Sequence, residues 1–164
     1  MILNIADVVD GRKREMRFDG VVVIDEETAP FNHNTDRSSA IDVKGRVYRS
    51  GDMLWIHMTY EGMVQFVCDR CLKPSEYAVS GELKRQLSNR DEFDVEWFII
   101  RGGKVDLAQV IADDLVVELP IQLICSEDCK GLCPQCGVNR NEQSCQCESE
   151  SIDPRLASLK NLFN

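Results

Sequence analysis

The sequence predicts an α+β protein: an antiparallel β-sheet or open barrel with one packed helix, followed by a cysteine-rich segment and a short C-terminal helix. Three observations support this fold class. Several strand-like runs precede a single stretch of helical periodicity. Six of the eight cysteines lie in one polar stretch between Cys125 and Cys147. The last residues carry a short apolar stripe at helical spacing.

The predicted strands occupy the first hundred residues. β-branched residues between turn formers mark residues 17–26, "RFDGVVVIDE", and residues 41–50, "IDVKGRVYRS". The run "MLWIHMTYEGMVQFVC" reads as two strands joined at Glu61 and Gly62, and "EYAVSGELKRQL" and "VEWFII" extend the series. The polar segment from Thr28 to Ser39 is expected to be an exposed loop.

One helix is predicted near residues 106–119. Asp106 is its expected N-cap, Gln109 the capping-box partner three residues on, and Pro120 the stop. The apolar positions recur at helical spacing and predict the face that packs on the sheet: Leu107, Val110, Ile111, Leu115 and Leu119.

The N-terminus bears on the chemistry of the thiols. Its short apolar run is broken by Asn4 and Asp7 and is followed, not preceded, by basic residues, so it is not expected to be a secretory signal. We therefore expect a cytoplasmic protein in a reducing compartment. There, clustered cysteines indicate metal binding or catalysis in preference to disulfides.

The spacing of the cysteines favours metal. Cys133 and Cys136 are separated by two residues, so both thiolates can face one ion, and Gly137 can adopt the left-handed conformation that turns backbone N–H groups toward sulfur. Cys145 and Cys147 would complete a tetrahedral, zinc-ribbon-like structural site.

The other four cysteines can form a second site. Cys68 and Cys71 with Cys125 and Cys129 would clip the tail onto the body, giving two zinc ions in all-cysteine sites. An alternative division assigns Cys125, Cys129, Cys133 and Cys136 to one ion and Cys68, Cys71, Cys145 and Cys147 to the other. A thioredoxin-like role for "CDRC" is disfavoured, because that motif belongs at a helix start and here it lies at a predicted hairpin tip.

The chain divides into three predicted parts. Residues 1–124 form the β-rich body, in keeping with 43% hydrophobic content, and residues 125–148 form the cysteine-rich segment. Residues 149–164 combine an acidic tether with a short helix that begins at Asp153 and Pro154 and that must dock on its own domain or on a partner.

The charge bears on possible partners. A net charge of −9 repels nucleic acid on average, so an RNA-binding protein of this composition needs a segregated basic face. The candidate basic residues are Arg12, Lys13, Arg14 and Arg17, and then Arg70, Lys73, Lys84, Arg85 and Arg90. The acidic surface suits a basic protein partner equally well.

Catalysis is not expected. A catalytic zinc keeps a position open for water beside three protein ligands, often including histidine, whereas eight cysteines suit two closed sites. His57 reads as a sheet-surface residue, and His33 has no general-base partner nearby in the sequence. Asp113 and Asp114 are consecutive in a helix and point about 100° apart, as on a solvated face.

A family resemblance rests on four elements in order: "CDRCLKP", "VDLAQVIADDLVVELPIQLIC", "CSEDCKGLCPQCGVNRNEQSCQC" and "DPRLASLKNLF". From residue 68 onward the chain resembles the bacterial and chloroplast YceD family, named for large ribosomal RNA subunit accumulation. Residues 1–67 match only as a β-rich lead-in. The resemblance implies a role in accumulation or processing of large-subunit rRNA, by binding rRNA or a pre-ribosomal particle, or by holding a basic ribosomal protein. Neither a membrane nor a small-molecule substrate is implied.

Overall fold

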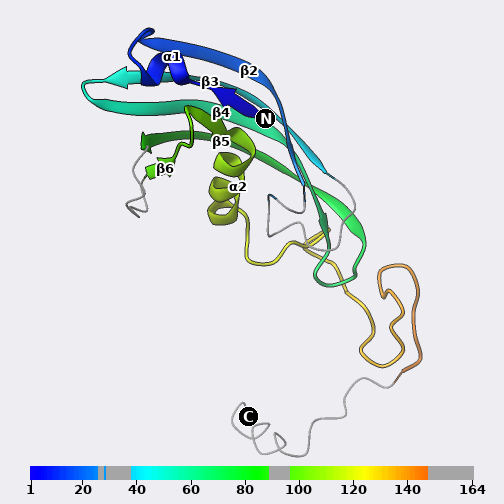
Figure 1. The fold of residues 1–164 in the computed structure, drawn as a ribbon. Helices are drawn as coiled ribbons and strands as arrows, with labels where there is room; N and C mark the ends of the chain where they lie inside the picture. Colours follow the sequence, from blue (N-terminus) through cyan, green and yellow to red (C-terminus); the bar gives the residue numbers. More distant parts are fainter. Residues whose placement is uncertain (26–27, 29–37, 89–96, 148–164) are drawn as a thin grey trace, which may run out of the picture.

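The computed structural model describes residues 1–25, 28, 38–88 and 97–147. Its main element is a five-stranded sheet with the order β2 (Glu15–Ile24), β3 (Ser39–Ser50), β4 (Met53–Val67), β5 (Pro74–Ser88) and β6 (Trp97–Ile99). The pairs β2–β3, β3–β4 and β4–β5 are antiparallel, and β6 runs parallel to β5. The predicted fold class is confirmed, with an open and strongly curved sheet in place of a barrel (Figure 1).

The strand β4 corrects one expectation. The run from Met53 to Val67 is one continuous strand, and the predicted join at Glu61 and Gly62 is wrong. Gly62 stays in register with Ile41 on one side and Val79 on the other. A Cβ at this position would lie 2.8 Å from the Ala40 carbonyl oxygen, so the glycine permits close strand approach and does not mark a turn.

Three short elements were not predicted. β1 (Ile2–Asn4) pairs with β7 (Lys104–Asp106) in a separate two-stranded sheet, and α1 (Ala6–Val9) follows β1. Elements of three or four residues carry too few positions to show a period. Most of the predicted loop from residue 28 to 39, and all of residues 149–164, lie outside the described part of the chain.

The helix α2 (Leu107–Glu118) confirms the predicted helix, with Asp106 at its N-cap accepting a hydrogen bond from the Ala108 N–H. The predicted capping box is wrong. The Gln109 side chain donates to Asp113 one turn on (2.8 Å) and does not reach back to the cap. No helix among the described residues is both long enough and apolar enough to cross a membrane.

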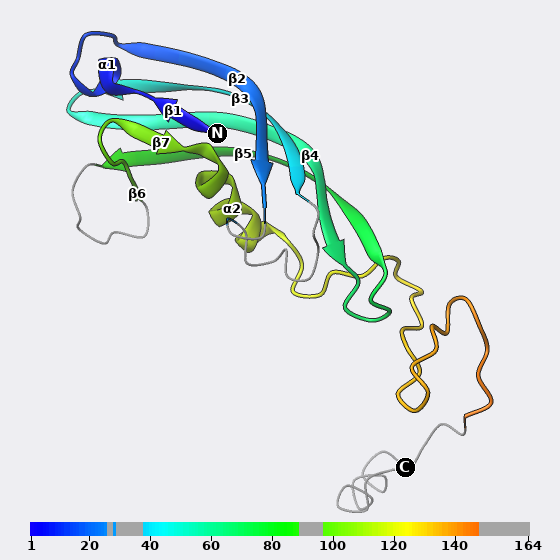
Figure 2. The same ribbon diagram turned by 45° about the vertical axis from the view of Figure 1, so that its right-hand side comes forward.

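The helix α2 lies against the concave side of the sheet, called here the inner face (Figures 1 and 2). Its buried residues join the inward side chains of the strands in one apolar core: Leu107, Val110, Ile111 and Leu115 from α2, with Val22, Ile41, Val47, Ile56, Met58 and Leu83 from the sheet. Polar contacts, called here the inner-face clamp, also fix how α2 is oriented on the sheet. Asp114 accepts hydrogen bonds from the Tyr60 hydroxyl (2.8 Å) and from Arg85 (3.3 Å).

Replacing Leu115 with Ala should lower the free energy of unfolding by about 2–5 kcal/mol, because Leu115 is 1% exposed and its removal leaves a cavity under α2. Val117 on the same helix is 80% exposed, so Val117→Ala is the matched control and should change stability by less than about 0.5 kcal/mol. Urea unfolding followed by circular dichroism measures both. Equal effects would show that α2 is not docked as described.

Candidate metal centres

Two groups of four cysteines come together in the structure. The sulfurs of Cys68, Cys71, Cys125 and Cys129 all lie within 4.8 Å of one another. So do the sulfurs of Cys133, Cys136, Cys145 and Cys147. We call these the clip tetrad and the tail tetrad. The sulfurs are grouped as in the first of the two divisions considered from the spacing, and the alternative division would join sulfurs from different groups.

Each tetrad is built on a similar tight turn. In the clip tetrad, the Leu72 N–H donates to the Cys68 carbonyl (2.9 Å) and the Cys68 N–H donates to the Lys73 carbonyl (3.0 Å). In the tail tetrad, the Gly137 N–H donates to the Cys133 carbonyl (2.9 Å) and the Cys133 N–H to the Val138 carbonyl (2.8 Å). The residue after each second cysteine has a positive φ, 58° at Leu72 and 73° at Gly137. The two Cys-x-x-Cys segments are therefore the same structural unit.

The clip tetrad holds the tip of the β4–β5 hairpin to the segment that follows α2. Asp69 exchanges two hydrogen bonds with Leu123: its N–H donates to the Leu123 carbonyl (2.9 Å), and its carboxylate accepts from the Leu123 N–H (2.7 Å). The Leu132 N–H donates to the Arg70 carbonyl (2.9 Å). Phe66, Leu123 and Leu132 pack around the sulfurs in a small second core. "CDRC" thus occupies a hairpin tip, as predicted.

The thiols of the clip tetrad are mostly buried, and Cys125 is the exposed one. Burial raises the pKa of Cys71 to about 12 and also raises the pKa of Cys125. Burial acts in the same direction on Cys68, but hydrogen bonds from the backbone N–H groups of Cys125, Cys71 and Arg70 outweigh it and lower that pKa to about 6. The pKa of Cys129 is also lowered, since bonds from the Gly131 N–H and the Asn141 amide outweigh burial.

The tail tetrad is more open. Cys133 is buried, Cys136 is exposed, and Cys145 and Cys147 are intermediate. Backbone N–H groups of Cys136 and Gln135 lower the pKa of Cys133 to about 6. A hydrogen bond with Cys136 together with burial raises the pKa of Cys147 to about 12. Each tetrad thus combines a thiol whose pKa is lowered with one whose pKa is raised, and a bound cation would replace the proton of the second.

The arrangement suits a tetrahedral cation with four sulfur ligands. Such donor sets are typical of structural zinc or iron–sulfur sites, and backbone N–H groups directed at the sulfurs are their usual second shell. Asn141 belongs to this shell, since its amide donates to the Cys129 sulfur (3.4 Å). Neither Asn141 nor Asp69 carried a signal in the sequence, because only the folded turns bring them to the tetrad.

The four predicted nucleic-acid contacts do not form one patch. Arg70 lies at the hairpin tip and donates to the Cys129 carbonyl (3.2 Å), while Lys73 pairs with Glu142 (3.8 Å). Lys84 and Arg85 follow each other on β5 and so point to opposite faces. Arg85 belongs to the inner-face clamp on Asp114, and Lys84 lies on the other face over the Trp55 ring.

The remaining polar candidates have local partners. His57 lies on the surface of the sheet, as predicted, with Nε2 2.6 Å from Glu82. Asp113 and Asp114 bond different partners, Gln109 and the Tyr60–Arg85 pair, and do not converge. His33 lies outside the described residues.

Gly137→Ala should destabilise the tail turn by about 1 kcal/mol, because a left-handed conformation is costly for a residue with a Cβ. No heavy atom lies within 4 Å of the added Cβ, so the effect isolates the backbone. Gly137→Asn is the control and should lose less, since asparagine tolerates this conformation. Amide hydrogen exchange at Cys133 measures both. Equal protection in all three proteins would contradict the described turn.

Comparison with known proteins identifies relatives. The family described as "Large ribosomal RNA subunit accumulation protein YceD" matches residues 56–163. The uncharacterized protein YlbN of Bacillus subtilis is 28% identical over 155 residues, which cover 92% of this chain and 90% of that protein. An uncharacterized protein of Mycobacterium tuberculosis is 33% identical over 130 residues, covering 76% of this chain and 62% of the relative.

A plant relative carries a functional name. "Large ribosomal RNA subunit accumulation protein YCED homolog 1, chloroplastic" of Arabidopsis thaliana is 37% identical over 59 residues, which cover 36% of this chain and 18% of that protein. No solved structure matches the chain significantly. Because the family match spans more than half of the chain and includes both tetrads, this protein belongs to the YceD family.

Proposed function

We propose that this protein is a non-catalytic, zinc-stabilised factor that supports large ribosomal subunit production by binding large-subunit rRNA. The observation that carries the proposal is the family match, whose name concerns accumulation of large-subunit rRNA. The Arabidopsis and maize relatives carry the same words in their names. The cytoplasm is the proposed site of action for this chain.

Zinc is the proposed ion at both tetrads. Thiolate ligands select soft or borderline cations, and zinc accepts a closed tetrahedral set of four sulfurs without redox chemistry. The eight cysteines are the proposed ligands, four to each ion. The ions would hold together a tail that has little apolar core of its own, since the second core beside the clip tetrad consists of few residues.

A structural role for the ions supports the absence of catalysis. A catalytic zinc normally keeps one position for water, and each tetrad already offers four sulfur ligands. Elsewhere in the described residues, the histidine and paired carboxylates that the sequence offered bond separate partners.

A second candidate function follows from charge. The chain carries a net charge of −9, and exposed carboxylates of Asp19, Asp42 and Glu61 gather on the sheet. Such a surface could hold a basic ribosomal protein or assembly factor by electrostatic complementarity. The two candidate functions differ in the molecule that the protein binds directly: rRNA in the first, and a basic protein in the second.

Native mass spectrometry should find two zinc ions per chain. The paired change Cys133→Ser and Cys136→Ser should release one ion and leave the β-rich body folded by circular dichroism, because the tail tetrad lies outside the main core. Ser126→Ala with Ser144→Ala is the control and should keep both ions. A reduced, folded protein that retains no metal would overturn the zinc assignment.

Crosslinking in growing cells, followed by sequencing of the attached RNA, should recover large-subunit rRNA above other RNA. The purified, zinc-loaded chain should bind the recovered segment, and binding should weaken as salt rises, because phosphate contacts release counterions. Recovery of a basic ribosomal protein without RNA would reject the first candidate in favour of the second.

A further inference from the structure

The outer face of the sheet, the side turned away from α2, is uncovered by any described element. On β4 the outward residues alternate with the buried ones and include Trp55, His57, Thr59 and Glu61. The helices α1 and α2 and the β1–β7 pair contribute to the core on the opposite face. Solvent-exposed faces of antiparallel sheets are common, so the side chains on this one decide whether it has a role.

A row of basic side chains crosses this face. Arg17 of β2 is paired in register with Arg46 of β3, Arg46 with His57 of β4, and His57 with Lys84 of β5. The row therefore spans four strands, roughly 14 Å at the usual strand spacing. Like charges placed directly opposite each other destabilise a sheet, and the carboxylate of Glu15, which bonds both Arg17 and Arg46, offsets that repulsion.

Two aromatic rings lie beside this row. Tyr48 and Trp55 are paired in register on β3 and β4, one position further along the outer face. The Arg46 guanidinium lies over the Tyr48 ring (4.8 Å), and the Lys84 ammonium lies over the Trp55 ring (4.9 Å). Both rings are partly exposed. Each ring thus lies under a cation, which a base that stacks on the ring would displace toward its own phosphate.

The row has a shape and local counter-charges. A shallow depression of about 280 Å³ lies along it, lined by Arg17, Lys44, Arg46, His57, Thr59 and Glu82. Glu15 bonds both Arg17 (2.8 Å) and Arg46 (3.2 Å), and Glu82 bonds His57. Arg17 and Arg46 nevertheless keep 81% and 45% of their side-chain surface exposed, so each guanidinium has N–H groups left for a ligand.

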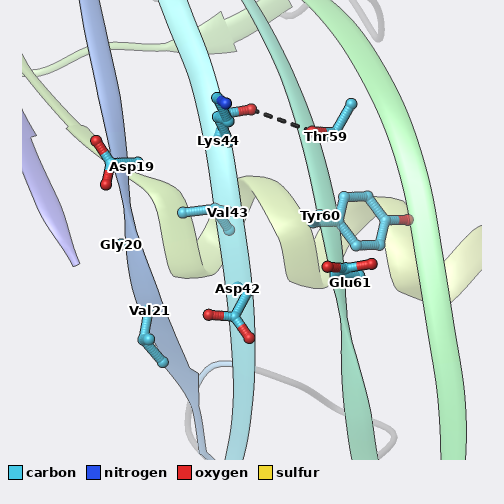
Figure 3. A pocket seen from close by; sticks show the side chains of 9 residues that line it. All are labelled: Asp19, Gly20, Val21, Asp42, Val43, Lys44, Thr59, Tyr60 and Glu61. Carbon is cyan, nitrogen blue, oxygen red and sulfur yellow. Dashed lines mark hydrogen bonds between the residues drawn. The ribbon is translucent and has the colours of Figure 1, made fainter.

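The neighbouring part of the outer face is acidic. A second depression of about 410 Å³ is lined by Asp19, Asp42 and Glu61 around Lys44 and Thr59. Figure 3 shows these side chains on strands that lie in front of α2, which crosses behind the sheet. The carboxylates would repel phosphate, so a bound polyanion is confined to the basic row and the two rings.

We propose that the outer face around Tyr48 and Trp55 is a platform for single-stranded RNA, with bases stacked on the two rings and phosphates held by Arg17, Arg46 and Lys84. This inference rests on the proposed function and names the surface that performs it. Rings that carry bases beside cations that track the backbone are the recurrent chemistry of single-strand binding. A basic protein partner would be repelled by the row, which favours RNA over the alternative partner at this face.

The test uses the zinc-loaded full chain and a short fluorescein-labelled single-stranded RNA, with binding followed by anisotropy. Trp55→Ala should weaken binding about tenfold through lost stacking. Arg46→Gln with Lys84→Gln should weaken binding and lower the slope of log K against log salt by about 1.4, since two phosphate contacts are lost. Arg101→Gln with Lys104→Gln removes the same charge, one arginine and one lysine, from exposed sites off this face and is the matched control.

A second measurement, tryptophan fluorescence, reports directly on the Trp55 ring and does not depend on variants that remove it. In a Trp97→Phe background, Trp55 is the single tryptophan of the chain. RNA that stacks on it should quench its emission, while the circular dichroism stays unchanged. Absence of quenching at saturating RNA would overturn the platform even if RNA is bound.

The outcomes separate the two proposals. If the wild-type chain binds no RNA, both the proposed function and the platform fail. If it binds RNA and the outer-face variants match the wild type while Arg70→Gln with Lys73→Gln weakens binding, the platform is overturned and the proposed function stands. If the outer-face variants lose only the capture of a purified basic ribosomal protein, the face belongs to that partner and the platform is again overturned.

Discussion

The convergence of four sulfurs at the tip of the β4–β5 hairpin is the constraint on which the tail depends. Around that point the Asp69–Leu123 pair, the Leu132–Arg70 bond and the packing of Phe66 join segments from two distant parts of the chain. Few apolar side chains lie there, and the four sulfurs are close enough together for one cation to bind all of them. Ligation of the proposed ion would therefore order the tail more than hydrophobic burial does.

The two faces of the sheet and the cysteine-rich tail differ in what they contribute to the molecule. The inner face of the sheet is used for folding, with α2 buried on it and Asp114 fixing the helix through Tyr60 and Arg85. The outer face contributes little to the core and is the surface proposed for RNA recognition. A long β4–β5 hairpin connects the two regions, because it carries Trp55 and Lys84 on its outer face and ends at the tip that holds Cys68 and Cys71.

The sequence predicted what depends on local patterns. β-branched runs and helical spacing located the principal strands and α2, and cysteine spacing led to the grouping of sulfurs seen in the structure. Gly62 misled because a glycine in a strand can mark a turn or a close strand contact, and only the register distinguishes them. The similarity of the two Cys-x-x-Cys turns could not be predicted, because Leu72 stands where the other turn has Gly137 and leucine seldom takes a positive φ.

The basic row could not be predicted from the sequence, for a different reason. Its members, Arg17, Arg46, His57 and Lys84, come from four strands and are scattered through the sequence. Their alignment follows from strand register, which is set by the buried residues on the opposite face. Basic residues that are neighbours in the sequence, such as Lys84 and Arg85, are separated by the alternation of a strand and serve different faces.

The separation between the two halves of the clip tetrad also has a consequence during synthesis. Cys71 meets Cys125, which lies 54 positions further along the chain. At about 5–20 residues per second, translation leaves the first two thiols without their partners for roughly 3–10 seconds after they are made. The hairpin tip is therefore completed late, after the segment that carries Cys125 and Cys129 has been made.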